Sequence, residues 1–226
     1  LVQQPSVIEY LVARAANDAV LRTLQVAATP DQLDPATAGR LRAALAAAPW
    51  PRPNGHIDGY QRYMILDVLV DLSEGQAVSY PEPRGIPLVP IHFALALTEA
   101  NEFVDRQLDA WKIPTFADRQ RALLAIDRDA RARTSSGTAR SPTVLGAMLI
   151  PSWVSLNEIV TERDAQEHLA LTALGLRVYQ AAHGNYPETL AAADIAAADA
   201  TDPFVDRPLV YRRDGAGYLL YSVGPD

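Results

Sequence analysis

The C-terminal stretch TDPFVDRPLVYRRDGAGYLLYSVGPD, residues 201–226, carries the strongest structural signal in this chain. It contains two runs that favour β-structure, PLVYRR at 208–213 and YLLYSV at 218–223. The residues between them, Asp-Gly-Ala-Gly at 214–217, tolerate the positive φ angles of tight turns. The pattern predicts an antiparallel β-hairpin. Because an isolated hairpin is only marginally stable, another element must cover one of its faces.

The element best suited to cover the hairpin is a long helix predicted to begin near Pro151. In its second half Leu169, Leu176 and Tyr179 recur at helical spacing and form one apolar face. Gly184 follows as a natural C-cap. We therefore expect the helix and the hairpin to pack together as one α+β module.

The rest of the chain reads mostly as helices. Residues 185–199 predict a turn and a short helix, and 76–90, which contain four prolines, predict an extended connector. Asp34 stands at an N-cap position, with Pro35 at the first helical position after it. Helices are predicted over the segments 5–24, 34–48, 56–75, 91–111 and 116–133.

These elements predict a mainly α protein with a small α+β module at its C-terminal end. The stretch TSSGTARSP has the composition of a linker. We expect an all-α helical domain over 1–134, a linker over 135–143, and the module of long helix and hairpin over 144–226.

Composition limits the classes of partner and site. The chain has 226 residues and a formal net charge of −7, which argues against a general nucleic-acid binder, because phosphate contacts need a basic surface. It has no cysteine, so disulfides and thiolate metal sites are excluded. The longest apolar run, TVLGAMLI at 143–150, is shorter than the roughly 18 residues that span a bilayer. We expect any membrane anchor to lie upstream of Leu1.

The C-terminal part resembles the globular module of the major pseudopilin of type II secretion systems. In that family a long helix carries a Tyr before a short Tyr-Pro turn, followed by an Asp-Pro-aromatic segment and a Tyr-Ser-apolar-Gly-x-Asp ending. The matching residues are Tyr179, Gly184, Tyr186, Pro187, Asp202, Pro203, Phe204, Tyr211, Tyr221, Ser222, Gly224 and Asp226. The whole chain resembles uncharacterised envelope proteins of the planctomycete type that share this ending.

This resemblance implies a non-enzymatic, extracytoplasmic structural or interaction subunit of a bacterial envelope or secretion-related assembly. Its partners would be other protein subunits, with no nucleic acid, and the membrane would be reached only through a segment upstream of Leu1. The expected interaction and core residues are Tyr179, Tyr186, Pro187, Asp202, Pro203, Phe204, Tyr211 and Tyr221. About 140 residues precede the module, so we do not expect assembly through a pilin-type helix bundle.

Two other functions fit the sequence. One is a hydrolase-type enzyme with a site between the helical domain and the C-terminal module. The other is a calcium-stabilised binding module, because the pseudopilin ending continues into a calcium loop. Asp226 is the one candidate ligand here, and calcium needs six to eight oxygens. We therefore expect no cofactor unless calcium binds.

Several polar residues could carry chemistry, but each has a plainer interpretation. Asp164 and His168, beside Glu167, have the spacing of two metal ligands on one helix face, or of a solvated turn. Asp202 is expected to fix the turn before Pro203. Five further residues could act as acid–base groups, but we expect them to be structural or exposed. They are His56, His92, His183, Asp206 and Asp214.

Overall fold

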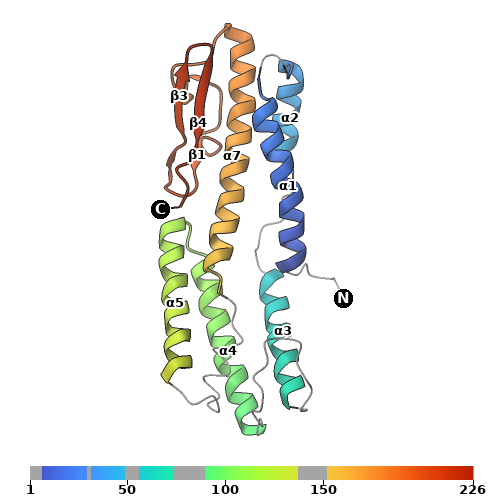
Figure 1. Cartoon of the computed structure of the whole chain (residues 1–226), viewed down its shortest axis with the longest axis vertical. Coiled ribbons are helices and arrows are strands. Elements are labelled where there is room, and N and C mark those ends of the chain that lie inside the picture. Colours follow the sequence, from blue (N-terminus) through green and yellow to red (C-terminus); the bar gives the residue numbers. More distant parts are fainter. Residues whose placement is uncertain (1–6, 30–31, 49–55, 74–89, 137–151, 226) are drawn as a thin grey trace. The chain divides into compact units, whose positions relative to one another are not determined.

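The computed structural model describes residues 7–29, 32–48, 56–73, 90–136 and 152–225 (Figure 1). Within these residues the chain is mainly helical and ends in a β-hairpin, which confirms the predicted fold class. The α-helices are α1 (Val7–Ala27), α2 (Pro35–Ala47), α3 (His56–Ser73), α4 (Pro90–Trp111), α5 (Phe116–Ser136) and α7 (Val154–His183). A 3-10 turn, η1 (Leu190–Ala192), and the strands β1 (Thr201–Asp202), β2 (Arg207–Pro208), β3 (Val210–Asp214) and β4 (Gly217–Tyr221) follow.

The described elements fall into two compact units that do not follow chain order. The first unit contains α3, α4, α5 from Asp118 onward, and the first turn of α7 up to Asn157. The second contains α1 from Ile8, α2, residues 115–117, α7 from Glu158, and everything after it. This division differs from the predicted boundary at 135–143, because α1 and α2 bury their apolar residues against α7.

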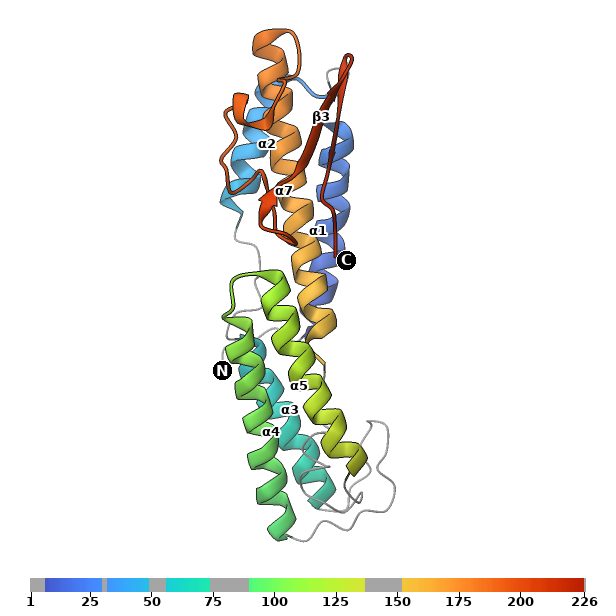
Figure 2. The same cartoon turned by 90° about the vertical axis from the view of Figure 1, so that its left-hand side faces the viewer.

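The main core of the second unit lies among three helices. In Figures 1 and 2, α1 and α2 both run alongside α7. Many of the buried residues are alanines, whose small side chains let helix backbones approach closely. The buried cluster consists of Leu21 from α1 and Ala28 just after it, Ala38 and Leu45 from α2, and Ala170, Leu171, Ala173 and Leu174 from α7.

The predicted helix ends are confirmed at two positions. The side chain of Asp34 accepts a hydrogen bond from the backbone N–H of Thr37 at 2.9 Å, and Pro35 begins α2. Gly184 has φ +79° immediately after α7, and its N–H donates to the carbonyl of Gln180 at 2.8 Å. Only glycine adopts this conformation without strain, so the chain can leave the helix sharply here.

The hairpin has the predicted position and turn. β3 and β4 are antiparallel, with Asp214 opposite Gly217 and Tyr211 opposite Leu220. The two-residue turn has φ +56° at Gly215, which is the arrangement of a turn with glycine at its first central position. One face of the hairpin packs against α7. Tyr211, Tyr218 and Leu220 contact the cluster of Leu176, Tyr186 and Ala193, together with Tyr179, Leu190 and Ile195.

The connection from α7 to the hairpin contains less helix than expected. The predicted short helix within 185–199 is a single 3-10 turn, and a small antiparallel sheet of β1 and β2 follows it. Two backbone carbonyls in this segment are engaged by distant side chains. Arg42 donates to the carbonyl of Asp194 at 2.9 Å, and Thr172 donates to that of Asp199 at 3.0 Å. These tertiary contacts outweigh the helix propensity of the alanines.

Candidate interaction surface

The two faces of the hairpin differ in exposure because residues alternate sides along a strand. Tyr211, Tyr218 and Leu220 point to the core and are half-buried. Leu219 and Tyr221 point the other way, and each keeps 43% of its surface exposed. Val223, which follows β4, is 49% exposed. The hairpin therefore has one face fixed to α7 and one face with apolar side chains in solvent.

An aromatic cluster holds the inner face of the hairpin. The ring of Tyr218 lies edge-on to the ring of Tyr186, and their centroids are 4.8 Å apart. The centroid of the Tyr211 ring lies 6.0 Å from that of Tyr218. The hydroxyl of Tyr211 donates to the carbonyl of Pro187 at 2.6 Å. Burial raises the pKa of Tyr218, Tyr186 and Tyr211 above that of a free tyrosine, most strongly for Tyr218. These rings act as a neutral, packed layer.

The carboxylate of Asp202 ties the end of the chain to the turn after β1. It is 1% exposed and accepts hydrogen bonds from the N–H groups of Phe204 at 3.0 Å and Val223 at 2.8 Å. The first bond, from two residues on, is the Asx-turn expected before Pro203. The second joins the segment after β4 to the same carboxylate. The interpretation of Asp202 as a structural turn residue is confirmed.

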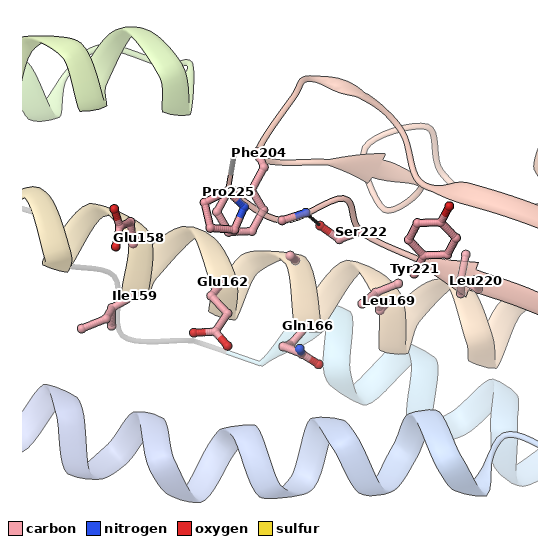
Figure 3. Close-up of a pocket in the computed structure, with 12 residues that line it drawn as sticks. Glu158, Ile159, Glu162, Gln166, Leu169, Phe204, Leu220, Tyr221, Ser222 and Pro225 are labelled. Carbon is pink, nitrogen blue, oxygen red and sulfur yellow. Dashed lines mark hydrogen bonds between the residues drawn. The ribbon is translucent and has the colours of Figure 1, made fainter.

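A hollow of about 550 Å³, here called the tail groove, lies between α7 and the end of β4 (Figure 3). Glu158, Glu162 and Gln166 line it from successive turns of α7, and Tyr221 and Ser222 line it from the opposite wall. The other lining residues are apolar or glycine: Ile159, Ala165, Leu169, Phe204, Leu220, Gly224 and Pro225.

The tail groove offers contact surface and negative charge. Of the described residues that line it, Glu158 and Glu162 are charged, and both are exposed. The hydroxyl oxygen of Ser222 accepts the N–H of Gly224 at 3.2 Å. Among the lining residues that the structure describes there is no histidine, lysine, arginine or cysteine. These residues do not supply a nucleophile beside a general base, whereas they can hold an extended segment.

A second hollow of about 520 Å³, here called the turn groove, lies beside the same strand. It is lined by Gln25, Val26 and Thr29 at the end of α1 and by Tyr186 and residues 216–220. Leu220 lines both grooves, so together they follow β4 from its turn to the residues after it. The side chain of Gln25 donates to the carbonyl of Gln166 at 3.0 Å, which joins α1 to α7 in this region.

The residues considered as metal ligands on α7 have other partners. Arg163 donates to Asp164 at 2.9 Å and to Glu167 at 2.8 Å. The Nδ1 atom of His168 lies 2.6 Å from the carbonyl oxygen of Thr201. Since a carbonyl only accepts, Nδ1 carries the proton, and the ring fixes the start of β1 to α7. Within the described ranges no three His, Cys, Asp or Glu residues gather as a possible metal site.

The remaining predicted residues are spread over the module. Phe204 packs edge-on to Phe116, with ring centroids 5.0 Å apart, and His183 stacks on Tyr179 at 3.9 Å. Asp206 has φ +51° in the turn between β1 and β2. Asp226 and the side chains of His56 and His92 lie outside the described residues. The calcium-stabilised alternative therefore stays a prediction.

Sequence reasoning missed two positions that shape the module. Arg177 is 6% exposed and donates to the carbonyl of Leu33 at 2.8 Å, which fastens the loop before α2 to α7. A Cβ atom at Gly175 would lie 2.7 Å from Cγ1 of Ile195, so glycine permits close packing there. A glycine inside a predicted helix was the available signal for the second position.

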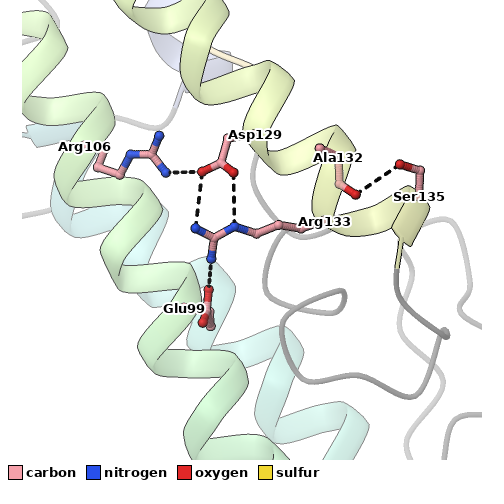
Figure 4. A network of polar contacts seen from close by, with 6 residues as sticks. All are labelled: Glu99, Arg106, Asp129, Ala132, Arg133 and Ser135. Atoms are coloured by element: carbon pink, nitrogen blue, oxygen red, sulfur yellow. Dashed lines mark hydrogen bonds and ion pairs between the residues drawn. The ribbon is translucent and has the colours of Figure 1, made fainter.

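Outside this surface, the first unit is held partly by a polar network between α4 and α5 (Figure 4). Asp129 accepts from Arg106 at 2.5 Å and from Arg133 at 3.3 Å, and Arg133 also donates to Glu99 at 2.6 Å. The hydrogen bond from Arg106 is the main cause of a lowered pKa at Asp129. Both guanidinium groups lie over the buried ring of Phe103, at 5.1 and 4.9 Å.

Comparisons with known proteins gave no relative: no protein-family model, curated protein or solved structure matches the chain. None of the helices in the described part of the chain is long and apolar enough to cross a membrane.

Proposed function

We propose that this chain is a non-enzymatic structural or interaction subunit of an extracytoplasmic bacterial assembly, and that its pseudopilin-like C-terminal module binds other protein subunits. The observation that carries the proposal is the division of the hairpin into a fixed face and a free face. The fixed face packs on α7 through Tyr211 and Tyr218. The free face exposes Leu219 and Tyr221.

Two further features support a binding role. Asp202 holds the segment after β4, so the exposed Val223 is presented by an ordered backbone. Two grooves follow the same strand and add concave surface beside the exposed side chains. Ordered apolar surface next to grooves is typical of protein interaction sites.

The proposal is tested in the cells that make the protein. Fractionation should recover the tagged chain with the envelope, and cross-linking should place it in a complex larger than a single chain. Leu219→Ser should weaken that complex. Leu124→Ser is the matched control, because Leu124 is 41% exposed on α5 in the other unit. Recovery of the wild-type chain as a free cytosolic monomer would contradict the proposal.

A further inference from the structure

Among the described residues β4 pairs with β3 alone, so no described strand pairs with its outer edge. Asp214 and Gly217 flank the two-residue turn and form the first pair of the ladder. In an antiparallel pair, alternate residues exchange hydrogen bonds with the partner strand. Gly217, Leu219 and Tyr221 therefore direct their N–H and C=O groups to β3. Tyr218 and Leu220 direct theirs outward.

In the segment after β4, the N–H of Val223, the next odd-numbered residue after Tyr221, donates to the carboxylate of Asp202. In the described part of the chain, no backbone hydrogen bond outside helices and strands involves Tyr218 or Leu220. An edge with such groups is a template for pairing with another chain.

The grooves lie along this same edge. The turn groove is lined by residues 216–220. The tail groove is lined by residues 220–222, 224 and 225, so Leu220 lines both grooves. A strand added beside β4 would project alternate side chains toward the two helices that line the grooves, α1 and α7. The edge supplies backbone recognition and the grooves supply side-chain recognition, which is how strand addition achieves affinity and specificity.

Charge indicates what kind of segment fits. Of the described residues that line the tail groove, Glu158 and Glu162 are charged, and the whole chain has a formal net charge of −7. An exposed carboxylate has about four lone-pair sites, so it can accept hydrogen bonds from more than one cation. A lysine or arginine is the complementary side chain there. A second copy of this acidic chain would instead bring like charges together.

We propose that the outer edge of β4 binds an extended segment of a different, basic protein as an additional antiparallel strand. The segment places apolar side chains over the turn groove and a lysine or arginine near its N-terminal end over Glu158 and Glu162. Antiparallel pairing puts that end beside the C-terminal end of β4. The inference rests on the proposed function as an interaction subunit and specifies how the partner is recognised.

The binding experiment uses the purified chain and a capped synthetic peptide, Lys-Val-Thr-Val-Thr-Val-Thr. Backbone amide exchange is followed residue by residue by NMR. The peptide should slow exchange at Tyr218 and Leu220 by about tenfold or more as binding saturates, since their N–H groups become paired. Leu219 is the internal control, because its N–H already faces β3. The same peptide with alternate amides N-methylated should have no effect.

Charge is tested with a peptide in which glutamate replaces lysine. The double variant Glu158→Lys, Glu162→Lys should bind this glutamate peptide and lose about tenfold or more in affinity for the lysine peptide. The matched control is Glu102→Lys, Asp109→Lys on α4, which changes the net charge equally and should leave both affinities as in the wild type.

Three results would overturn the inference. The first is no slowing of exchange at Tyr218 and Leu220 with the lysine peptide. The second is equal binding of the N-methylated peptide. The third is protection of both amides by self-association of the chain at high concentration without peptide. A native complex that survives the Glu158, Glu162 double variant would also overturn it while leaving the proposed function intact. Absence of any native complex would contradict the proposed function alone.

Discussion

The carboxylate of Asp202 accepts a hydrogen bond from the backbone N–H of Val223, 21 positions later in the chain, at 2.8 Å. Its other oxygen accepts the N–H of Phe204 at 3.0 Å. One buried side chain thus fixes both the turn after β1 and the segment after β4. The ordered end of the chain depends on this carboxylate, although the two segments it joins are distant in sequence.

Replacing Asp202 with alanine should destabilise the module strongly. Two backbone donors lose a charged acceptor in a buried position, so the free energy of unfolding should fall by about 2–4 kcal/mol. Asp202→Asn should restore one acceptor and give a smaller loss. Urea denaturation measures the change, and faster amide exchange at Val223 locates it.

The matched control is Asp214→Ala, which removes an exposed carboxylate from the same hairpin. It should change stability by no more than about 0.5 kcal/mol. Equal stability losses in Asp202→Ala and Asp214→Ala would show that the buried carboxylate has no special role.

Local signals in the sequence were sufficient for the described α-helices and the β3–β4 hairpin. Asp34 and Gly184 mark helix ends because capping depends on a few adjacent residues. The turn signal at Gly215 is local as well, and it was enough to predict the hairpin and its register. The small β1–β2 sheet was missed because its strands are only two residues each and its geometry depends on the buried Asp202.

The partners of the helices could not be predicted in the same way. Leu21 of α1 and Leu174 of α7 belong to ordinary apolar stripes, and a stripe does not indicate which other stripe will cover it. Arg177 donates to the backbone carbonyl of Leu33. Because every residue has such a carbonyl, the sequence does not indicate that Leu33 is the partner. The predicted boundary at 135–143 differs from the observed units for this reason.

The candidate surface was predictable in part. Strand alternation is enough to separate the inner Tyr211 from the outer Tyr221 once the hairpin is recognised. The grooves were not predictable, because they depend on which side of α7 and which end of α1 lie beside β4.

Gly175→Ala should destabilise the second unit despite the better helix propensity of alanine. The added Cβ would meet Cγ1 of Ile195 at 2.7 Å, and overpacking typically costs about 1–3 kcal/mol. Gly39→Ala is the matched control within α2, since nothing lies within 4 Å of its Cβ position. It should stabilise the protein by up to about 1 kcal/mol. Thermal and urea unfolding of both variants measure the difference.

A double-mutant cycle tests the cause of this effect. Ile195→Ala removes the atoms that the new Cβ would meet, so the loss from Gly175→Ala should shrink in that background. If the two losses simply add, the steric explanation is wrong.

Alkaline pH should weaken the packing of the hairpin through Tyr218. Burial raises its pKa in the folded protein above the value of about 10 in an unfolded chain. The stability it contributes is therefore fully present below about pH 10 and is lost as pH rises toward the folded pKa. Tyr218→Phe should reduce the slope of stability against pH there by up to about 1.4 kcal/mol per pH unit.

Urea unfolding at a series of alkaline pH values measures this slope. Tyr221→Phe is the control for the loss of one tyrosine from the same strand, because Tyr221 is 43% exposed. An unchanged slope in Tyr218→Phe would contradict the role assigned to the buried ring.

Asp129 should make the first unit sensitive to acid. Its carboxylate accepts from Arg106 and Arg133, and these hydrogen bonds lower its pKa in the folded protein. The stability it contributes is present above the unfolded pKa of about 3.9 and is lost as pH falls through the folded value. Asp129→Asn should therefore reduce stability at neutral pH, by about 0.5–1 kcal/mol for a partly exposed network, and should flatten the acid limb. Asp109→Asn removes an exposed ion pair with Lys112 and should have little effect on stability. If the free energy of unfolding falls equally with acid in the wild type and in Asp129→Asn, the prediction is wrong.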